Sequence, residues 1–300
     1  MNEGYWGKKA SIRDFVVRMI PDAQTQISAL QAGEIDLVLD LLPEQAKLAP
    51  RFLSAPATEF SYIQFNAHKK EMADPKVRIA LNLAVDKETL AKTIYLGHAR
   101  PMDAQHLSKG MLGYNPKLKP FPYDPKKARQ LLKEAGYPDG FELVLHAPIG
   151  RYLKGEETSE FVAAQLKEVG VRVKVQLHEW NAYRKLGRIA GKEAGAFDLK
   201  YGWNSNEWFD ASRIVSHITC DGTSSKLCNK KVDELMDKAI KTLDQKERDK
   251  LYQQVWATLN DDPHAVYLLQ QNLIYGLAKR LEWQPRVDDE VRVAMMRFTE

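Results

Sequence analysis

The feature that most limits the fold of this chain is the alternation of helix signals with strand patterns. Asp-Pro pairs at 74–75 and 124–125 mark helix starts, because Asp caps the first turn and Pro suits the first helical position. Gly136 and Gly170 are typical helix stops. The segment "VRVKVQLHE" (171–179) alternates apolar and polar residues as a half-buried strand does. The alternation predicts an α/β or α+β protein with crossover connections.

The same signals along the chain predict one set of elements. The expected strands are 12–20, 34–42, 58–67, 141–147, 171–179, 197–203, 265–271 and 273–279. The expected helices lie between Asp22 and Gly33, after Asp74, between Asp86 and Gly97, between Asp124 and Gly136, at 158–169, at 182–190, and from about 230 and 245. The Pro- and Gly-rich stretch 98–122 is expected to be a long surface loop.

Two extended crossings, next to Pro56 and Pro263, suggest that one domain is inserted into another. We therefore predict a central lobe over 59–264. Residues 1–58 and 265–300 should together form part of a second lobe.

Composition excludes several classes of protein. The 300 residues carry 44 Lys and Arg against 40 Asp and Glu, a net charge of +4, with no basic cluster of the kind that binds nucleic acid. The longest apolar runs, such as 37–42, fall far short of the roughly 20 residues that span a bilayer. The start "MNEGYWGKKA" lacks the apolar core of a signal peptide. Direct membrane insertion is therefore not expected.

The stretch "YGWNSNEWFD" fits neither a helical nor a strand period. Its candidate ligand-binding residues are Tyr201, Trp203, Asn204, Asn206, Glu207 and Asp210. Trp203 can offer a flat apolar wall, and the asparagines can donate and accept hydrogen bonds along a ligand backbone. The stretch follows a predicted strand, and loops at strand ends often line binding sites. On the residues alone, it is equally possible that Trp203 and Trp208 only cover the domain.

Catalytic signatures are missing from the sequence. It contains no Gly-x-Ser-x-Gly, no phosphate-binding loop and no dinucleotide fingerprint. "HEWNAYR" begins like a zinc-protease helix, but Ala182 stands where the second histidine should be. Glu207 and Asp210 are a carboxylate pair near an aromatic loop, although chance pairs are common among 40 acidic residues. Hydrolysis of a glycoside or a peptide is therefore the alternative function. For a glycosidase the two carboxylates would have to lie about 5 to 9.5 Å apart. No catalytic residue, metal or cofactor is predicted.

Cys220 and Cys228 are the only cysteines. Their spacing allows a disulfide or two free thiols, and no second pair of ligands indicates a metal.

"FPYDPKKARQLLKEAGYPDGF" (121–141) resembles the signature helix of the family 5 extracytoplasmic solute-binding proteins, the dipeptide and oligopeptide receptors of ABC importers. "NEGYWG" (2–7), "RMIPDAQTQISALQAGEIDLV" (18–38), "DPKVRIALNLAVDKETLAKTIYLGHARP" (74–101) and "CNKKVDELMDKAI" (228–240) are also similar to segments of that family.

The resemblance implies a periplasmic-binding-protein-like α/β fold of class II, with one complete lobe and a remnant of the other. It also implies a binding protein in the periplasm or outside the cell, which delivers a peptide or similar polar solute from an inter-lobe cleft to a membrane permease. Export favours a Cys220–Cys228 disulfide. Members of this family normally carry a long portion ahead of "NEGYWG", so a non-binding structural remnant is a further alternative.

In the peptide-binding members, the loop after the tryptophan meets the amino end of the ligand and has Asp three residues on. Here that position is Asn206. The resemblance therefore implies that the loop lines the cleft but lacks the usual ion pair with a ligand ammonium.

Overall fold

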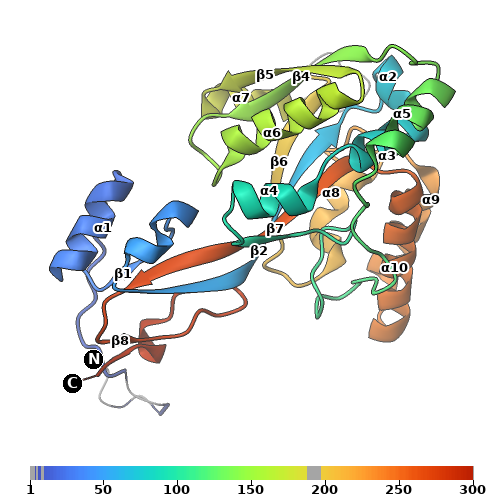
Figure 1. Cartoon of the computed structure of the whole chain (residues 1–300). Helices are drawn as coiled ribbons and strands as arrows, with labels where there is room; N and C mark the ends of the chain where they lie inside the picture. The colour runs from blue at the N-terminus through green and yellow to red at the C-terminus, as the bar shows by residue number, and fades with distance from the viewer. Residues whose placement is uncertain (1–3, 5, 8–9, 188–196, 300) are drawn as a thin grey trace. The chain divides into compact units, whose positions relative to one another are not determined.

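The computed structural model describes residues 4, 6–7, 10–187 and 197–299 (Figure 1). Its α-helices are α1 (Ala23–Ala32), α2 (Lys70–Ala73), α3 (Pro75–Leu83), α4 (Lys87–Thr93), α5 (Pro125–Glu134), α6 (Gly155–Glu168), α7 (Trp180–Gly187), α8 (Val215–Ile218), α9 (Lys230–Lys241) and α10 (Gln245–Asp261). Its strands are β1 (Leu37–Val38), β2 (Arg51–Phe65), β3 (Ala99–Pro101), β4 (Phe141–Pro148), β5 (Val171–His178), β6 (Leu199–Ser205), β7 (Ala265–Leu277), β8 (Leu281–Glu282) and β9 (Arg297–Phe298).

The chain divides into two compact units. The larger unit comprises 59–94 and 100–270, and the smaller comprises 1–58, 95–99 and 271–300. Strands β2 and β7 contribute residues to both units.

In the larger unit the strand order is β7-β2-β6-β4-β5. Strand β4 runs parallel to β5 and to β6, whereas β2 is antiparallel to β6. Helix α6 connects β4 to β5 and packs against both strands, which is a parallel crossover unit. This mixed sheet with crossover helices confirms the α/β class.

One apolar cluster of the larger unit lies between α9, α10 and the loop that precedes α5. Helices α9 and α10 pack side by side (Figure 1). Tyr252, Trp256 and Leu259 are buried on one face of α10, as their helical spacing indicates.

Helix starts follow the capping residues seen in the sequence. The Asp124 carboxylate accepts the backbone N–H of Lys127 at 2.8 Å, and Pro125 is the first helical residue of α5. Gly136 follows this helix with φ of 90°, a conformation that Gly adopts without strain. Asp74 caps α3 in the same way through the N–H of Lys76. The predictions of these two helices are confirmed.

The smaller unit has its own apolar cluster. Ile27 and Leu30 of α1 pack there with Leu41, Ile274 and Trp283. Strand β1 pairs antiparallel with the end of β7, and β8 pairs with β9. Two short 3-10 helices, Pro43–Leu48 and Val293–Met295, complete the unit.

Four of the expected strands are absent, shortened or merged in the structure. Residues 12–20 form no strand: Val16, Val17 and Met19 are 79%, 74% and 93% exposed, and among the described residues no strand pairs with this segment. A strand needs a neighbour for its backbone hydrogen bonds, and apolar alternation alone does not supply one. The expected strand at 34–42 shrinks to β1, and the two expected strands after 265 form the single strand β7.

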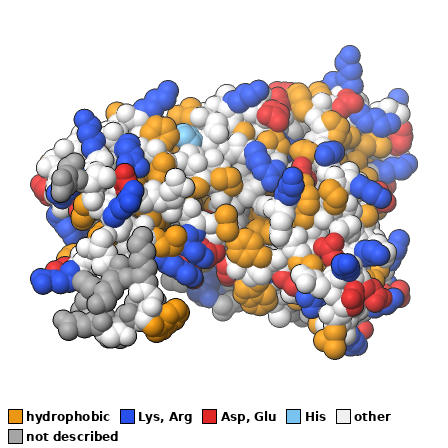
Figure 2. Space-filling view, turned by 90° about the horizontal axis from the view of Figure 1, so that it is seen from below, with side chains coloured by type: hydrophobic (Ala, Val, Ile, Leu, Met, Phe, Trp, Pro, Cys, Tyr) orange, Lys and Arg blue, Asp and Glu red, His pale blue; other side chains and the backbone are white. Residues whose placement is uncertain are grey.

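Two further observations concern the helices and the surface. No described helix combines the length and the apolar character needed to cross a membrane. On the face drawn in Figure 2, basic and acidic side chains are interspersed, with hydrophobic side chains between them.

Candidate functional site

Strand β6 of the larger unit has one open edge. It pairs with β2 over seven residues, from Leu199 to Ser205, but it pairs with β4 only through Leu199 and Lys200. Beyond Lys200, the described part of the chain places no strand on that edge. The Tyr183 hydroxyl donates a hydrogen bond to the carbonyl of Tyr201 there. Because alternate residues of a strand direct their backbone groups to the same edge, the N–H and C=O of Trp203 also face it.

An aromatic wall stands beside this open edge. The rings of Trp203 and Tyr152 stack with centroids 5.1 Å apart and an interplanar angle of 6°. Trp180 meets Tyr152 edge-on at 6.0 Å and stacks on Tyr183 at 5.9 Å. These four side chains form what we call the aromatic wall: Tyr152, Trp180, Tyr183 and Trp203. Trp203 is only partly exposed, so one part of its ring is buried and the rest is open to contact.

Cations lie over the faces of this wall. The Arg151 guanidinium is 5.5 Å from the centre of the Tyr152 ring and 5.1 Å from that of Trp180. The Lys200 ammonium lies 4.7 Å from the centre of the Tyr183 ring. Aromatic faces attract cations because their π electrons carry partial negative charge. The wall therefore presents aromatic surface with cations over its rings, and the negative charge of Glu59 also acts on Tyr152.

Tyr201 and Asn204 are buried, with 0% and 7% of their surface exposed. Asn204 lies opposite Phe60 of β2, and Gly202 lies opposite Tyr62. A Cβ on Gly202 would come within 2.1 Å of the Tyr62 ring, so glycine is required for this packing. These residues support the wall from within the sheet. The structure therefore gives Tyr201 and Asn204 a different position from the ligand-lining one that the sequence suggested.

Asn206 closes the loop on itself. Its side-chain amide donates to the carbonyl of Asp210 at 3.1 Å, and its side-chain oxygen accepts the N–H of Asp210 at 3.4 Å. The residue is 3% exposed. Phe209, inside the turn, has φ of 54°, a conformation that non-glycine residues adopt only where surrounding contacts hold it. Asn206 thus braces a tight turn.

The two carboxylates of the loop are engaged locally. Glu207 lies 3.7 Å from the guanidinium of Arg213. Burial acts to raise the pKa of Glu207, but hydrogen bonds from its own backbone and from Ser205, together with Arg213, lower it overall. The Asp210 carboxylate accepts the N–H of Ser212 at 2.8 Å and caps the 3-10 helix Ala211–Ile214. Each carboxylate is therefore held by a neighbouring donor.

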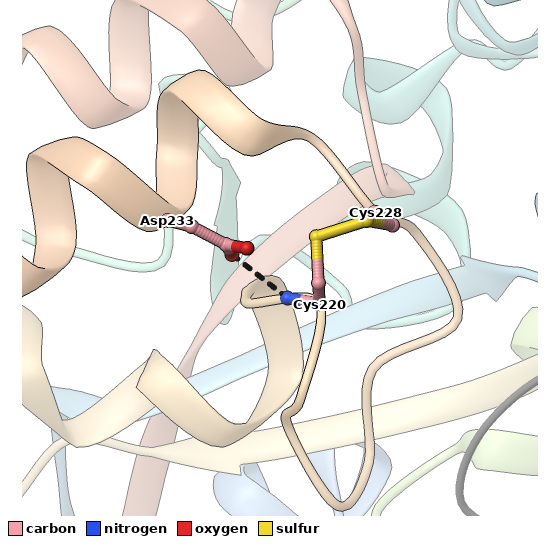
Figure 3. A group of neighbouring side chains, drawn as sticks. All are labelled: Cys220, Cys228 and Asp233. Atoms are coloured by element: carbon pink, nitrogen blue, oxygen red, sulfur yellow. Dashed lines mark hydrogen bonds between the residues drawn. A yellow bond between two sulfur atoms is a disulfide. The ribbon is translucent and has the colours of Figure 1, made fainter.

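Cys220 and Cys228 are joined by a disulfide, with their Cα atoms 4.3 Å apart (Figure 3). The Asp233 carboxylate accepts the backbone N–H of Cys220 at 2.8 Å. The bond ties the end of α8 to the start of α9. Within the described residues, these three are the one group of His, Cys, Asp and Glu spaced for a metal, and the disulfide occupies both sulfurs.

Reasoning from the sequence missed Tyr152, Trp180, Tyr183 and Lys200. Tyr152 follows the carboxyl end of β4, and Trp180 follows the carboxyl end of β5, so both stand where parallel strands end. Their position after these strands could have indicated that they belong to the site, because the carboxyl ends of neighbouring parallel strands meet at one edge of a sheet.

The profile of the bacterial extracellular solute-binding proteins, family 5 Middle, matches residues 1–226. The chain belongs to this family.

Relatives of this family 5 chain are themselves described as binding proteins. It is 33% identical over 267 residues to a heme-binding protein A of Haemophilus influenzae, covering 84% of this chain and 48% of the relative. It is 30% identical over 294 residues to a glutathione-binding protein of Pectobacterium atrosepticum, covering 93% of this chain and 56% of the relative.

A solved structure with the same fold is the ABC transporter-associated periplasmic binding protein DppA of Helicobacter pylori, in complex with a peptide STSA. The TM-score is 0.78 at 26% identity, with 100% of this family 5 chain and 59% of that protein covered. The chain spans about half the length of the curated relatives that it matches. These matches confirm the expected family and its mixed α/β fold.

Proposed function

We propose that this chain is the ligand-binding part of the receptor of an ABC-type importer, and that its ligand is a peptide or a polar solute of similar size. The observation that carries the proposal is the aromatic wall beside the open edge of β6. An extended ligand backbone can hydrogen-bond to the N–H and C=O of Trp203 there, as an added strand would. The Trp203 ring then covers the adjacent part of the ligand.

Family membership supports this function over catalysis. The relatives and the solved neighbour are named for what they bind, and one of them holds a peptide. The hydrolase alternative loses its support, since Glu207 pairs with Arg213 and Asp210 caps a short helix. In the complete receptor, ligand binding would shift the population toward the form that docks on the membrane permease.

We further propose that residues 59–264 correspond to the complete second lobe of such a receptor, and that 1–58 with 265–300 belong to the first. The separate apolar clusters of the two units support this division. The receptor would work in the periplasm or at the outer surface of the cell.

The test is calorimetric titration of the full-length receptor with small peptides, using Trp203→Ala and, as a matched control, Trp208→Ala. Trp208 is 64% exposed and lies in the same loop. Losing a stacked aromatic contact of about 1.4 kcal/mol weakens affinity about tenfold. We expect that loss for Trp203→Ala and less than a twofold change for Trp208→Ala. Equal affinities for both variants and the unmodified receptor would contradict a site at this wall.

A further inference from the structure

The loop after β6 offers no uncommitted negative charge to a ligand. Asn206 is neutral, and both ends of its side-chain amide bond to the backbone of Asp210. Glu207 pairs with Arg213, and Asp210 caps the following turn. A ligand ammonium placed here would have to share a carboxylate that already has a partner.

Lys200, at the opposite end of the same strand, carries a positive charge that is not paired with a described carboxylate. No carboxylate of the described residues lies within ion-pair distance of its ammonium, which instead rests over the Tyr183 ring at 4.7 Å. Its neighbours across the sheet are Gln64 on β2 and His146 on β4, and neither is acidic. The residue is partly exposed.

The charged group that lowers the pKa of Lys200 is also basic. Burial, and then the positive charge of Lys226, lower the pKa of Lys200 to about 8. Burial lowers the pKa of His217 to about 4, with further contributions from Arg213 and Lys200. Lys200 is therefore largely charged at neutral pH in surroundings that repel its charge. A negative group bound beside it would relieve that repulsion.

We propose that the ligand of this receptor presents a carboxylate to Lys200 and no ammonium to the loop at Asn206. Its class is an anionic solute, such as a peptide with a blocked amino end. This inference rests on the proposed function. At about 3.3 Å per strand residue, Lys200 lies about 10 Å from Trp203 along β6, and the two side chains lie on opposite faces of the sheet. An extended ligand of about three residues that follows the strand edge spans that length.

Four alanine tripeptides separate the possibilities: the free peptide, its amide, the N-acetyl peptide and the N-acetyl amide. Each is titrated into the full-length receptor by calorimetry. We expect the N-acetyl peptide to bind at least tenfold more tightly than the N-acetyl amide, and at least as tightly as the free peptide. The inference is overturned if the acid and amide forms bind equally, or if the free peptide binds tenfold more tightly than the acetylated one. In both cases the peptide-binding function stands, whereas binding of none of the four overturns both proposals.

Variants assign the carboxylate preference to Lys200. Lys200→Gln should bring the affinities for N-acetyl peptide and N-acetyl amide within threefold of each other, and Lys200→Arg should keep the tenfold preference. Lys174→Gln is the matched control, because Lys174 is an exposed lysine on β5 of the same sheet. An acid preference that survives Lys200→Gln unchanged would place the anion elsewhere and refute the assignment.

Discussion

A buried histidine pair should make this protein lose stability in mild acid. His106 and His264 are 1% and 2% exposed, and their Nε2 atoms lie 3.1 Å apart. One nitrogen must donate and the other accept, so the two rings cannot both be charged. The other nitrogen of His264 lies 3.2 Å from the Tyr267 hydroxyl. Burial, then the charges of His217 and Arg78, lower the pKa of His264 to about 3. Burial and the neighbouring His264 also hold the pKa of His106 well below its usual value.

The direction of the pH effect on stability follows from which state, folded or unfolded, binds the proton. In the unfolded chain His264 has a pKa of about 6.5, so below that pH the unfolded state binds a proton that the folded state does not bind. The contribution of His264 to stability is therefore complete above about pH 6.5 and falls as the pH drops toward 3. At about 1.36 kcal/mol per pH unit, the free energy of unfolding falls by about 2 kcal/mol between pH 6.5 and 5. His106 adds to this loss in the same direction.

Urea unfolding at pH 7.5 and pH 5, followed by tryptophan fluorescence, measures the loss. His264→Gln cannot titrate, so it should lose about 2 kcal/mol less than the unmodified chain over this interval. His68→Gln is the control, because His68 is exposed, and it should lose as much as the unmodified chain. His106→Gln gives a second test of the pair. Equal losses in the unmodified chain and in both buried-site variants would refute the reasoning.

Three further predictions concern stability and solubility. Reducing the Cys220–Cys228 disulfide should lower the free energy of unfolding by about 2 to 3 kcal/mol on the loop-entropy model, measured by urea unfolding with and without reductant, and an unchanged midpoint would contradict it. Asp124→Ala removes the cap of α5 and should lower stability by about 1 kcal/mol, whereas Asp124→Asn should restore most of it; equal losses would show that the cap bond is unimportant. Met19→Ser, at a side chain 93% exposed, should reduce concentration-dependent self-association in sedimentation, and unaltered association would show that this surface is not adhesive.

Local signals predicted the local elements of this fold well. The Asp124 cap, Pro125 and Gly136 act within one or two helical turns, so the sequence alone places α5. The alternation of residues 171–179 likewise gave β5, because one face of that strand packs under α6. The segment 12–20 has the same alternation without a paired neighbour, and pairing is a property of the whole fold.

The site was harder to predict because its parts meet only after folding. Trp203 stood out in the sequence, but its stacking partner Tyr152 comes from a loop before α6. The hydrogen bond between Asn206 and the backbone of Asp210 depends on a turn in which Phe209 has an unusual positive φ. No local sequence pattern predicted that turn. The role proposed for Lys200 depends on the lowered pKa of its ammonium, which is caused by burial and by Lys226 from elsewhere in the sequence.

Hydrogen–deuterium exchange of the full-length protein, with and without saturating N-acetyl trialanine, tests the proposed ligand site most directly. The open edge of β6 leaves the Trp203 N–H to a ligand backbone, so bound peptide should slow exchange in peptides that contain residues 201–210. Exchange at β8 and β9 of the smaller unit serves as the internal reference. Slowed exchange at 201–210 and around Tyr152 is the result that we predict. Saturating peptide that leaves both segments unchanged, while slowing exchange elsewhere, would contradict a ligand site at the aromatic wall.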